Sequence, residues 1–317
     1  MMRKTFTAIA LLAAFAPAAA ASAGSVETPK PLAATSLHAA GTVLGAADRA
    51  TIALREGDGS VLLLGDGDKR RTLAARPGCV PAAAGSGVIA WDCVATVDIT
   101  DLAGAQQGSF PRYTAPGAQS PAVTSSVGSQ WVFQVVPPAD RGYGVRWTNW
   151  RTGATRSDDP TDPRLSYGLD TPALTAPYCG PIAASPVGAT PDQNYEGPAL
   201  RPVQYRAPYA LIDSRTGPAR PGNPVRHTLR RCGNAGFVKV PPSFTTAPAA
   251  VLGGAGWVAW RPASGSGALQ IMRAATSRRF VATRAIATLK APAIVFTRSN
   301  VWVQTSARTI ARVALPG

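Results

Sequence analysis

The sequence predicts an all-β fold for three reasons: a short strand-like phrase recurs along it, residues that break helices are frequent, and turn residues lie beside the strand-like runs. In each copy of the phrase, a small residue precedes apolar and aromatic residues. The copies lie at residues 50–54, 87–91, 129–133, 207–211, 256–260 and 299–303. Successive copies are 37, 42, 78, 49 and 43 residues apart. A repeat of about 40–50 residues is typical of a β-propeller, so we predict a single propeller of four-stranded antiparallel blades.

The chain begins with the features of a signal peptide, which we place at residues 1–23. Arg3 and Lys4 form a basic start, residues 7–16 are an apolar run, and residues 21–23 (Ala-Ser-Ala) resemble a cleavage site. The run is too short for a good membrane-spanning helix, although a retained N-terminal anchor is the alternative. We therefore expect cleavage near Ala23 and a secreted, extracytoplasmic protein without a membrane span.

After this leader, we expect a linker at residues 24–36 and the propeller domain at residues 37–317, a length that can bury a large core. Long helices are disfavoured because 29 Pro and 31 Gly residues interrupt the chain. Strand-like runs lie at residues 61–64, 88–91, 131–136, 145–150, 257–260, 294–296 and 301–303. Turn-forming sequences adjoin them at residues 57–59, 65–67, 151–153, 215–217 and 264–267.

The 78-residue spacing decides between six blades and seven. Its excess lies at about residues 180–206, a stretch that contains five prolines at positions 181, 186, 191, 198 and 202. Such a stretch suits a loop better than a sheet, so we predict six blades with a loop insertion before the fourth, and seven blades as the alternative. The middle of this loop is a candidate binding element, with an inert connection as the alternative. Its residues are Gln193, Asn194, Tyr195 and Glu196.

Four cysteines in an exported chain indicate two disulfides, with three possible connectivities. Cys79 and Cys93 flank one short strand-to-strand passage and are the natural first pair. Cys179 and Cys232 are then left to pair with each other. A metal site is the competing interpretation, but the chain has no CxxC pair and only two histidines. We therefore predict no metal.

Motifs that would identify a reaction are absent: there is no G-x-S-x-G, no H-E-x-x-H and no P-loop. His38 and His227 are the only possible histidine bases. The acidic candidates are Asp58, Asp66, Asp68, Asp98, Asp101, Asp158, Asp159, Asp162 and Asp170. The first three lie in Gly-rich hairpins, where Asp is favoured for turn reasons, and residues 158–162 lack the spacing of an EF-hand. We predict no catalytic residue and no cofactor.

The formal net charge of +15 suits an anionic partner, and loss of Arg3 and Lys4 with the leader would lower it to +13. Of the 32 basic residues, 27 are Arg and 5 are Lys. They cluster weakly at residues 69–71, 230–231 and 278–279. Outside the cytoplasm, an anionic envelope polymer or phospholipid surface is a more natural partner than nucleic acid.

With these repeats, the chain resembles the secreted TolB-like and WD40-like β-propellers of GC-rich, actinobacterial-type bacteria. Residues 87–91 and 256–260 are similar to the inner-strand phrase of those blades, and residues 101–104 and 150–153 to the turn phrase that follows. The resemblance covers most of residues 37–315. It implies a binding or scaffold role and carries over no catalytic residue.

The function we expect is that of a non-catalytic, exported, monomeric propeller that binds a protein or glycan in the cell envelope or medium. Distant carboxylates can meet in a fold, so a glycan hydrolase or lyase with a site in the central funnel is one alternative. A surface protein that binds polyanions through an arginine-rich face is the other.

Overall fold

The computed structural model describes residues 29–116, 118–139, 142–158, 199–206, 208–215, 225–231, 236–263, 268–282 and 294–317. Several predictions fall outside these ranges: the signal peptide at residues 1–23, the second disulfide between Cys179 and Cys232, and the candidate binding loop. Its four residues, Gln193, Asn194, Tyr195 and Glu196, are likewise outside. These predictions stay as predictions.

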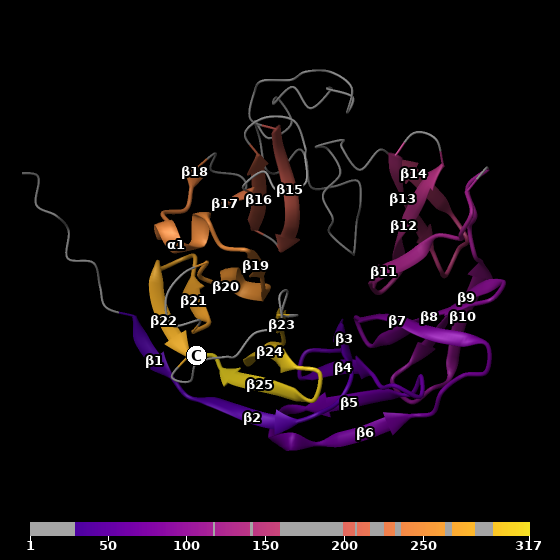
Figure 1. The fold of residues 1–317 in the computed structure, drawn as a ribbon, viewed down its shortest axis with the longest axis horizontal. Helices are drawn as coiled ribbons and strands as arrows, with labels where there is room; N and C mark the ends of the chain where they lie inside the picture. The colour runs from indigo at the N-terminus through magenta and orange to yellow at the C-terminus, as the bar shows by residue number, and fades with distance from the viewer. Residues whose placement is uncertain are drawn as a thin grey trace, which may run out of the picture.

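The described residues form six sheets that follow one another around a ring, as the all-β propeller prediction requires (Figure 1). Blade 1 is β3 (Thr42–Ala46), β4 (Thr51–Arg55), β5 (Val61–Gly65) and β6 (Arg70–Leu73). Blade 2 is β7 (Cys79–Gly85), β8 (Val88–Cys93), β9 (Thr96–Asp101) and β10 (Gln106–Pro111). Blade 3 is β11 (Val123–Val127), β12 (Trp131–Ala139), β13 (Gly142–Asn149) and β14 (Thr155–Asp158).

The second half of the ring repeats this order. Blade 4 is β15 (Ala199–Arg206), β16 (Tyr209–Arg215), β17 (Val225–Arg231) and β18 (Gly236–Phe237). Blade 5 is β19 (Ala249–Leu252), β20 (Trp257–Arg261), β21 (Gln270–Arg273) and β22 (Arg278–Ala282). Blade 6 is β23 (Ile294–Phe296), β24 (Asn300–Ser306) and β25 (Thr309–Ala314), joined by β2 (Ala34–His38). The described helical residues are α1 (Pro242–Thr245) and the single 3₁₀ turns η1 (Asp66–Asp68) and η3 (Gly254–Gly256).

The recurring phrase occupies the second strand of every blade, not the innermost strand that the resemblance implied. The first strands lie nearest the centre of the ring, and neighbouring first strands contact each other, as β3 with β7 and β7 with β11 (Figure 1). Strands that converge on an axis need small residues, such as those of residues 82–85. The second strand is covered on both sheet faces and therefore takes the bulky side chains. Trp91, Trp260 and Trp302 are all fully buried there.

The apolar core is divided among the interfaces between adjacent blades. One cluster joins blades 1 and 2 around Trp91, and the next joins blades 2 and 3 around Trp150. Similar clusters join blades 4 and 5, blades 5 and 6, and blades 6 and 1. Blades 1, 2, 5 and 6 thus bury both faces against neighbouring blades, which is how a propeller stabilises sheets that could not fold alone.

The N-terminal segment closes the ring, which corrects the predicted linker. Residues 24–36 were expected to precede the propeller, but β2 is the outer strand of blade 6 and pairs antiparallel with β25. Further upstream, β1 (Lys30–Leu32) pairs in parallel with β22 as a fifth strand of blade 5. Residues 34–38 therefore fill the outer position of blade 6, next to β25.

The predicted loop at residues 180–206 also needs correction at its C-terminal end. Residues 199–206 form β15, the first strand of blade 4, despite Pro202. The register shifts between Pro202 and Gln204, and β15 is an edge strand. Proline is tolerated in a sheet at edges and bulges, where no ladder bond is lost, so a proline-rich sequence can still be a strand. In the described part of the chain, no helix has the length and apolar character needed to span a membrane.

Candidate functional site

The candidate site is an open groove of about 510 Å³ on the outside of the interface between blades 1 and 2. One wall is the end of β6 and the connection that follows it, residues 72–77. The other wall is blade 2, through Trp91, Asp98 and Thr100. We call this space the groove.

The connection is held by local structure at its far end. The N–H of Cys79 donates to the carbonyl of Arg76 at 3.1 Å, and Gly78 adopts the left-handed region with φ of 73°, which glycine favours. Cys79 then enters β7 directly opposite Cys93 of β8. The two sulfurs are bonded, which confirms the predicted first disulfide. The bond ties the connection to blade 2 and so positions Arg76.

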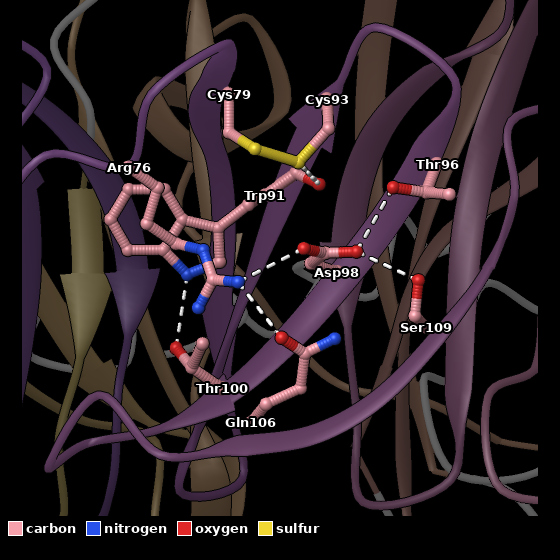
Figure 2. A network of polar contacts seen from close by, with 9 residues as sticks. All are labelled: Arg76, Cys79, Trp91, Cys93, Thr96, Asp98, Thr100, Gln106 and Ser109. Atoms are coloured by element: carbon pink, nitrogen blue, oxygen red, sulfur yellow. Dashed lines mark hydrogen bonds and ion pairs between the residues drawn. A yellow bond between two sulfur atoms is a disulfide. The ribbon is translucent and has the colours of Figure 1, made fainter.

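An ion pair between Arg76 and Asp98 spans the groove wall (Figure 2). One terminal nitrogen of the guanidinium lies 3.0 Å from Oδ2 of Asp98 and donates to Oε1 of Gln106 at 2.9 Å. The other carboxylate oxygen of Asp98 accepts from the hydroxyls of Thr96 at 3.0 Å and Ser109 at 2.7 Å. Three donors from three segments therefore hold the carboxylate, whose side chain is only 14% exposed.

Beneath the ion pair lies Trp91, which is 1% exposed. The guanidinium carbon of Arg76 is 6.0 Å from the centre of its ring, and Figure 2 shows the guanidinium over the indole. The indole N–H donates to the hydroxyl of Thr100 at 2.9 Å. Trp91 is thus a fixed apolar floor that orients Arg76 through a cation–π contact.

The groove offers more hydrogen-bond donors than acceptors on its charged side chains. Nε and the second terminal nitrogen of Arg76 donate to no residue of the described part of the chain, and the side chain is 28% exposed. Asp98, in contrast, is already engaged by three donors. A ligand that accepts hydrogen bonds, such as a carboxylate, suits this arrangement better than one that only donates.

Metal binding is not supported at this place. Sulfurs of Cys79 and Cys93 lie within 4.8 Å of a carboxylate oxygen of Asp98, which is a possible ligand spacing. Both sulfurs are in the disulfide, however, and a metal would need them as thiolates. The cluster is therefore a structural cross-link beside an ion pair.

A second polar contact lies in the next interface, between blades 2 and 3. Asp92 of β8, 8% exposed, accepts from the N–H of Thr124 at 3.1 Å and from its hydroxyl at 2.6 Å. Arg112 lies 3.5 Å from the same carboxylate and donates to the carbonyls of Cys93 and Ala122. Because these groups fasten two blades together, we assign Asp92 a structural role.

The two histidines lie in different blades. His227 is buried in β17, its Nε2 lies 2.9 Å from the carbonyl oxygen of Ala247, and its ring meets Phe244 edge-on. It joins blade 4 to the segment that leads into blade 5. His38 is exposed at the end of β2.

The acidic candidates lie at different places in the fold and do not form one cluster among the described residues. Asp58 accepts from the hydroxyl and N–H of Ser60, which hold the pKa of its carboxyl below the ordinary 3.8. Asp101 accepts from two N–H groups in the turn between β9 and β10. Asp58 thus has the turn role that the sequence predicts, and Asp101 has a similar role in its own turn.

Asp66 and Asp68 belong to the interface between blades 1 and 6. Asp66 accepts from the side chain of Asn300, and Asp68 lies 3.0 Å from the guanidinium of Arg312. Asp158 is in β14, while Asp159, Asp162 and Asp170 lie outside the described residues.

The described strands at the centre of the ring carry no carboxylate and no histidine. Their sequences are TVLGA, CVPAAAG, VTSSV, ALRPVQYR, AAVL and IVF, from β3 to β23. None of these six described strands contains Asp, Glu or His. A pair of catalytic carboxylates at the centre would therefore have to come from elsewhere.

Arginines are used around the whole ring. Six guanidinium groups lie over aromatic rings, with the guanidinium carbon 4.2–6.0 Å from the ring centroid. They belong to Arg76, Arg146, Arg151, Arg230, Arg273 and Arg312. They are distributed over blades 3 to 6 and the connection between blades 1 and 2. This distribution favours a structural use of arginine over one continuous basic face.

The sequence pattern indicated the strand that carries Asp98, but not the partners of that residue. Asp98 stood out only as one acid among several, but residues 96–100 alternate polar and apolar, which indicates a strand with one polar face. Arg76 and Gln106 were missed. They come from a connection and from the next strand, where periodicity says nothing about which partner they meet.

No family model and no curated protein sequence matches this chain. Among solved structures, a chain of the mitotic checkpoint complex is 10% identical, with a TM-score of 0.47 over 98% of this chain and 100% of that chain. YCF48 bound to a D1 peptide is 8% identical, with a TM-score of 0.47 over 91% of this chain and 100% of that chain. The Pan2 WD40 domain of Neurospora crassa is 9% identical, with a TM-score of 0.42 over 88% of this chain and 90% of that chain.

These likenesses say nothing of function, because they are distant in sequence and only approximate in shape. TolB-like character and an actinobacterial-type source stay predictions.

Proposed function

We propose that this protein is an exported, non-catalytic binding module that holds a protein or glycan partner in the cell envelope or medium, and that the groove is its contact site. The observation that carries the proposal is the free edge of the Arg76 guanidinium. It is pre-oriented by Asp98, Gln106 and Trp91 and faces an open volume of about 510 Å³. Pre-orientation lowers the entropic cost of binding.

None of the six described first strands contains Asp, Glu or His, which supports a binding role over glycan cleavage by a central pair of carboxylates. His227 and Asp98, which the sequence offers as candidates, are both engaged in structural contacts. Export is supported by the basic start, apolar run and small-residue site of residues 1–23. Protein recovered from the culture medium or envelope should begin near Gly24 on N-terminal sequencing, and a start at Met1 would refute cleavage.

A capture experiment with matched variants tests the groove. The mature chain, its R76Q variant and an R308Q control are immobilised and exposed to envelope and medium fractions, and bound proteins and glycans are quantified. Arg308 is exposed in the turn after β24, far along the chain from the groove. We expect the main partner to fall by about tenfold with R76Q and to be unchanged with R308Q. Equal capture by all three chains would refute the groove as the site, and turnover of a captured glycan would refute the non-catalytic assignment.

A further inference from the structure

The outer edge of one blade already carries an additional strand. β1 lies along β22 in parallel, with Lys30 opposite Phe280, Pro31 opposite Val281 and Leu32 opposite Ala282. It is a fifth strand on a four-stranded blade, and Figure 1 shows it at the rim of the ring. The geometry of this propeller therefore permits an extended segment to pair with an outer blade edge.

The outer edge of blade 1 is open in the described structure. β6 is the last strand of its sheet and pairs only with β5. The N–H of Gly65 donates to the carbonyl of Lys69 at 2.8 Å, so Lys69 is at a hydrogen-bonded position of the ladder. Since such positions alternate along an antiparallel pair, the N–H and C=O of Arg70 and Thr72 point to the open edge. They are a template for an added strand.

The charge at this edge selects the kind of strand that would pair. Lys69 and Arg70 are exposed, and neither side chain has a partner among the described residues. Arg71 is exposed as well and donates to the carbonyl of Leu102. Nearby carboxylates are engaged elsewhere, Asp68 by Arg312 and Asp98 by Arg76.

The other open outer edges differ from β6. β2 and β10 carry no Lys, Arg, Asp or Glu, and β1 carries one lysine in three residues. β14 carries one charge of each sign, and β18 is two residues long. Among the described strands, β6 thus combines an open edge, a basic run and an adjoining groove. Basic side chains at an edge discourage pairing between copies of a basic chain but favour an acidic strand.

We infer that β6 binds an extended, acidic segment of a partner protein as a fifth strand of blade 1. The inference rests on the binding role proposed above and names its partner class. The backbone of Arg70 and Thr72 supplies the ladder bonds, and Lys69 and Arg70 pair with acidic side chains on the added strand. Where the segment passes the end of β6 it enters the groove, and there the free edge of Arg76 receives a further carboxylate. Backbone pairing supplies affinity and the side chains supply specificity.

Synthetic peptides test this arrangement on the mature chain. The probe is a fluorescent peptide of alternating glutamate and valine, followed by anisotropy. Its first control has N-methyl groups on alternate residues, which remove backbone donors but keep the charge, and its second replaces glutamate with lysine. We expect saturable binding of the probe, and about tenfold or greater loss with either control. Binding of the N-methylated peptide as tight as that of the probe would overturn strand pairing.

Matched protein variants locate the binding. K69E/R70E changes the edge, whereas R298E/R308E makes the same change of charge at exposed turn residues of blade 6. The first should lose the probe by about tenfold or more and the second should keep it, with circular dichroism confirming that both fold. Equal loss in both, or equal competition by an acidic polysaccharide, would show simple charge attraction and overturn the inference. If peptides fail while capture still depends on Arg76, the proposed function stands and the inference alone is wrong.

Discussion

Replacing Gly85 with alanine should destabilise the propeller through a single backbone contact. Gly85 ends β7, and a Cβ placed on it would lie 2.2 Å from the carbonyl oxygen of Val127 in β11. Backbone must move by about 1 Å to restore an ordinary contact, and overpacking of this kind costs about 3 kcal/mol. Alanine lowers the entropy of the unfolded chain, which returns about 1 kcal/mol. We expect a net loss of about 2 kcal/mol in the free energy of unfolding.

Urea unfolding followed by tryptophan fluorescence measures this loss, provided that the slope with urea is unchanged. The matched control is Gly57→Ala, because a Cβ at Gly57 meets nothing within 4 Å. That variant should be as stable as the parent or slightly more stable. If Gly85→Ala unfolds within about 0.5 kcal/mol of the Gly57 variant, the close approach of the first strands is not what sets the spacing between blades 2 and 3.

Three further results are expected. Replacing both Cys79 and Cys93 with serine should lower the free energy of unfolding by about 3 kcal/mol, the loop-closure value for a sequence separation of 14. In the same urea assay, a reductant should lower the stability of the parent to that of the variant. Asp92→Ala should lower the free energy of unfolding by about 3 kcal/mol, measured by calorimetry or urea unfolding, because it leaves the Arg112 guanidinium without its carboxylate in the interface between blades 2 and 3. An unchanged free energy of unfolding would show that water replaces the carboxylate. The lowered pKa of Asp58 contributes stability above about pH 3.8, and that stability is lost as the pH falls through the pKa of the folded state. Ser60→Ala should therefore raise the pKa of Asp58 toward 3.8 in an NMR titration, and an unchanged pKa would rule out the Ser60 hydroxyl as the main cause of the shift.

The basic composition has a partly structural explanation. An arginine can cover an aromatic ring with its planar guanidinium and still reach a carboxylate, as Arg76 does with Trp91 and Asp98. Lysine cannot do both with the same geometry. The high ratio of arginine to lysine is therefore consistent with interfaces between blades as well as with an anionic partner.

Local pattern was enough to predict the all-β class, a strand at each copy of the recurring phrase, and the turns at residues 57–59 and 151–153, but not the position of that strand within its blade. It was also enough for the Cys79–Cys93 bond, since those residues face each other within one hairpin. All of these depend on residues close together in the chain, whose side-chain period and turn chemistry can be read directly. The error over residues 199–206 has a local cause too, because a proline-rich edge strand looks like a loop.

What only the tertiary structure decided is which distant segments meet. The pairing of β2 with β25, the fifth strand β1 beside β22, and the placement of Arg76 against Asp98 all follow from how blades stack and how the ring closes. Periodicity along a strand identifies a buried face but not the face that covers it, because that choice depends on the packing of whole blades. The groove and the open edge of β6 lie between such elements, so the function proposed for them could not have been derived from the sequence alone.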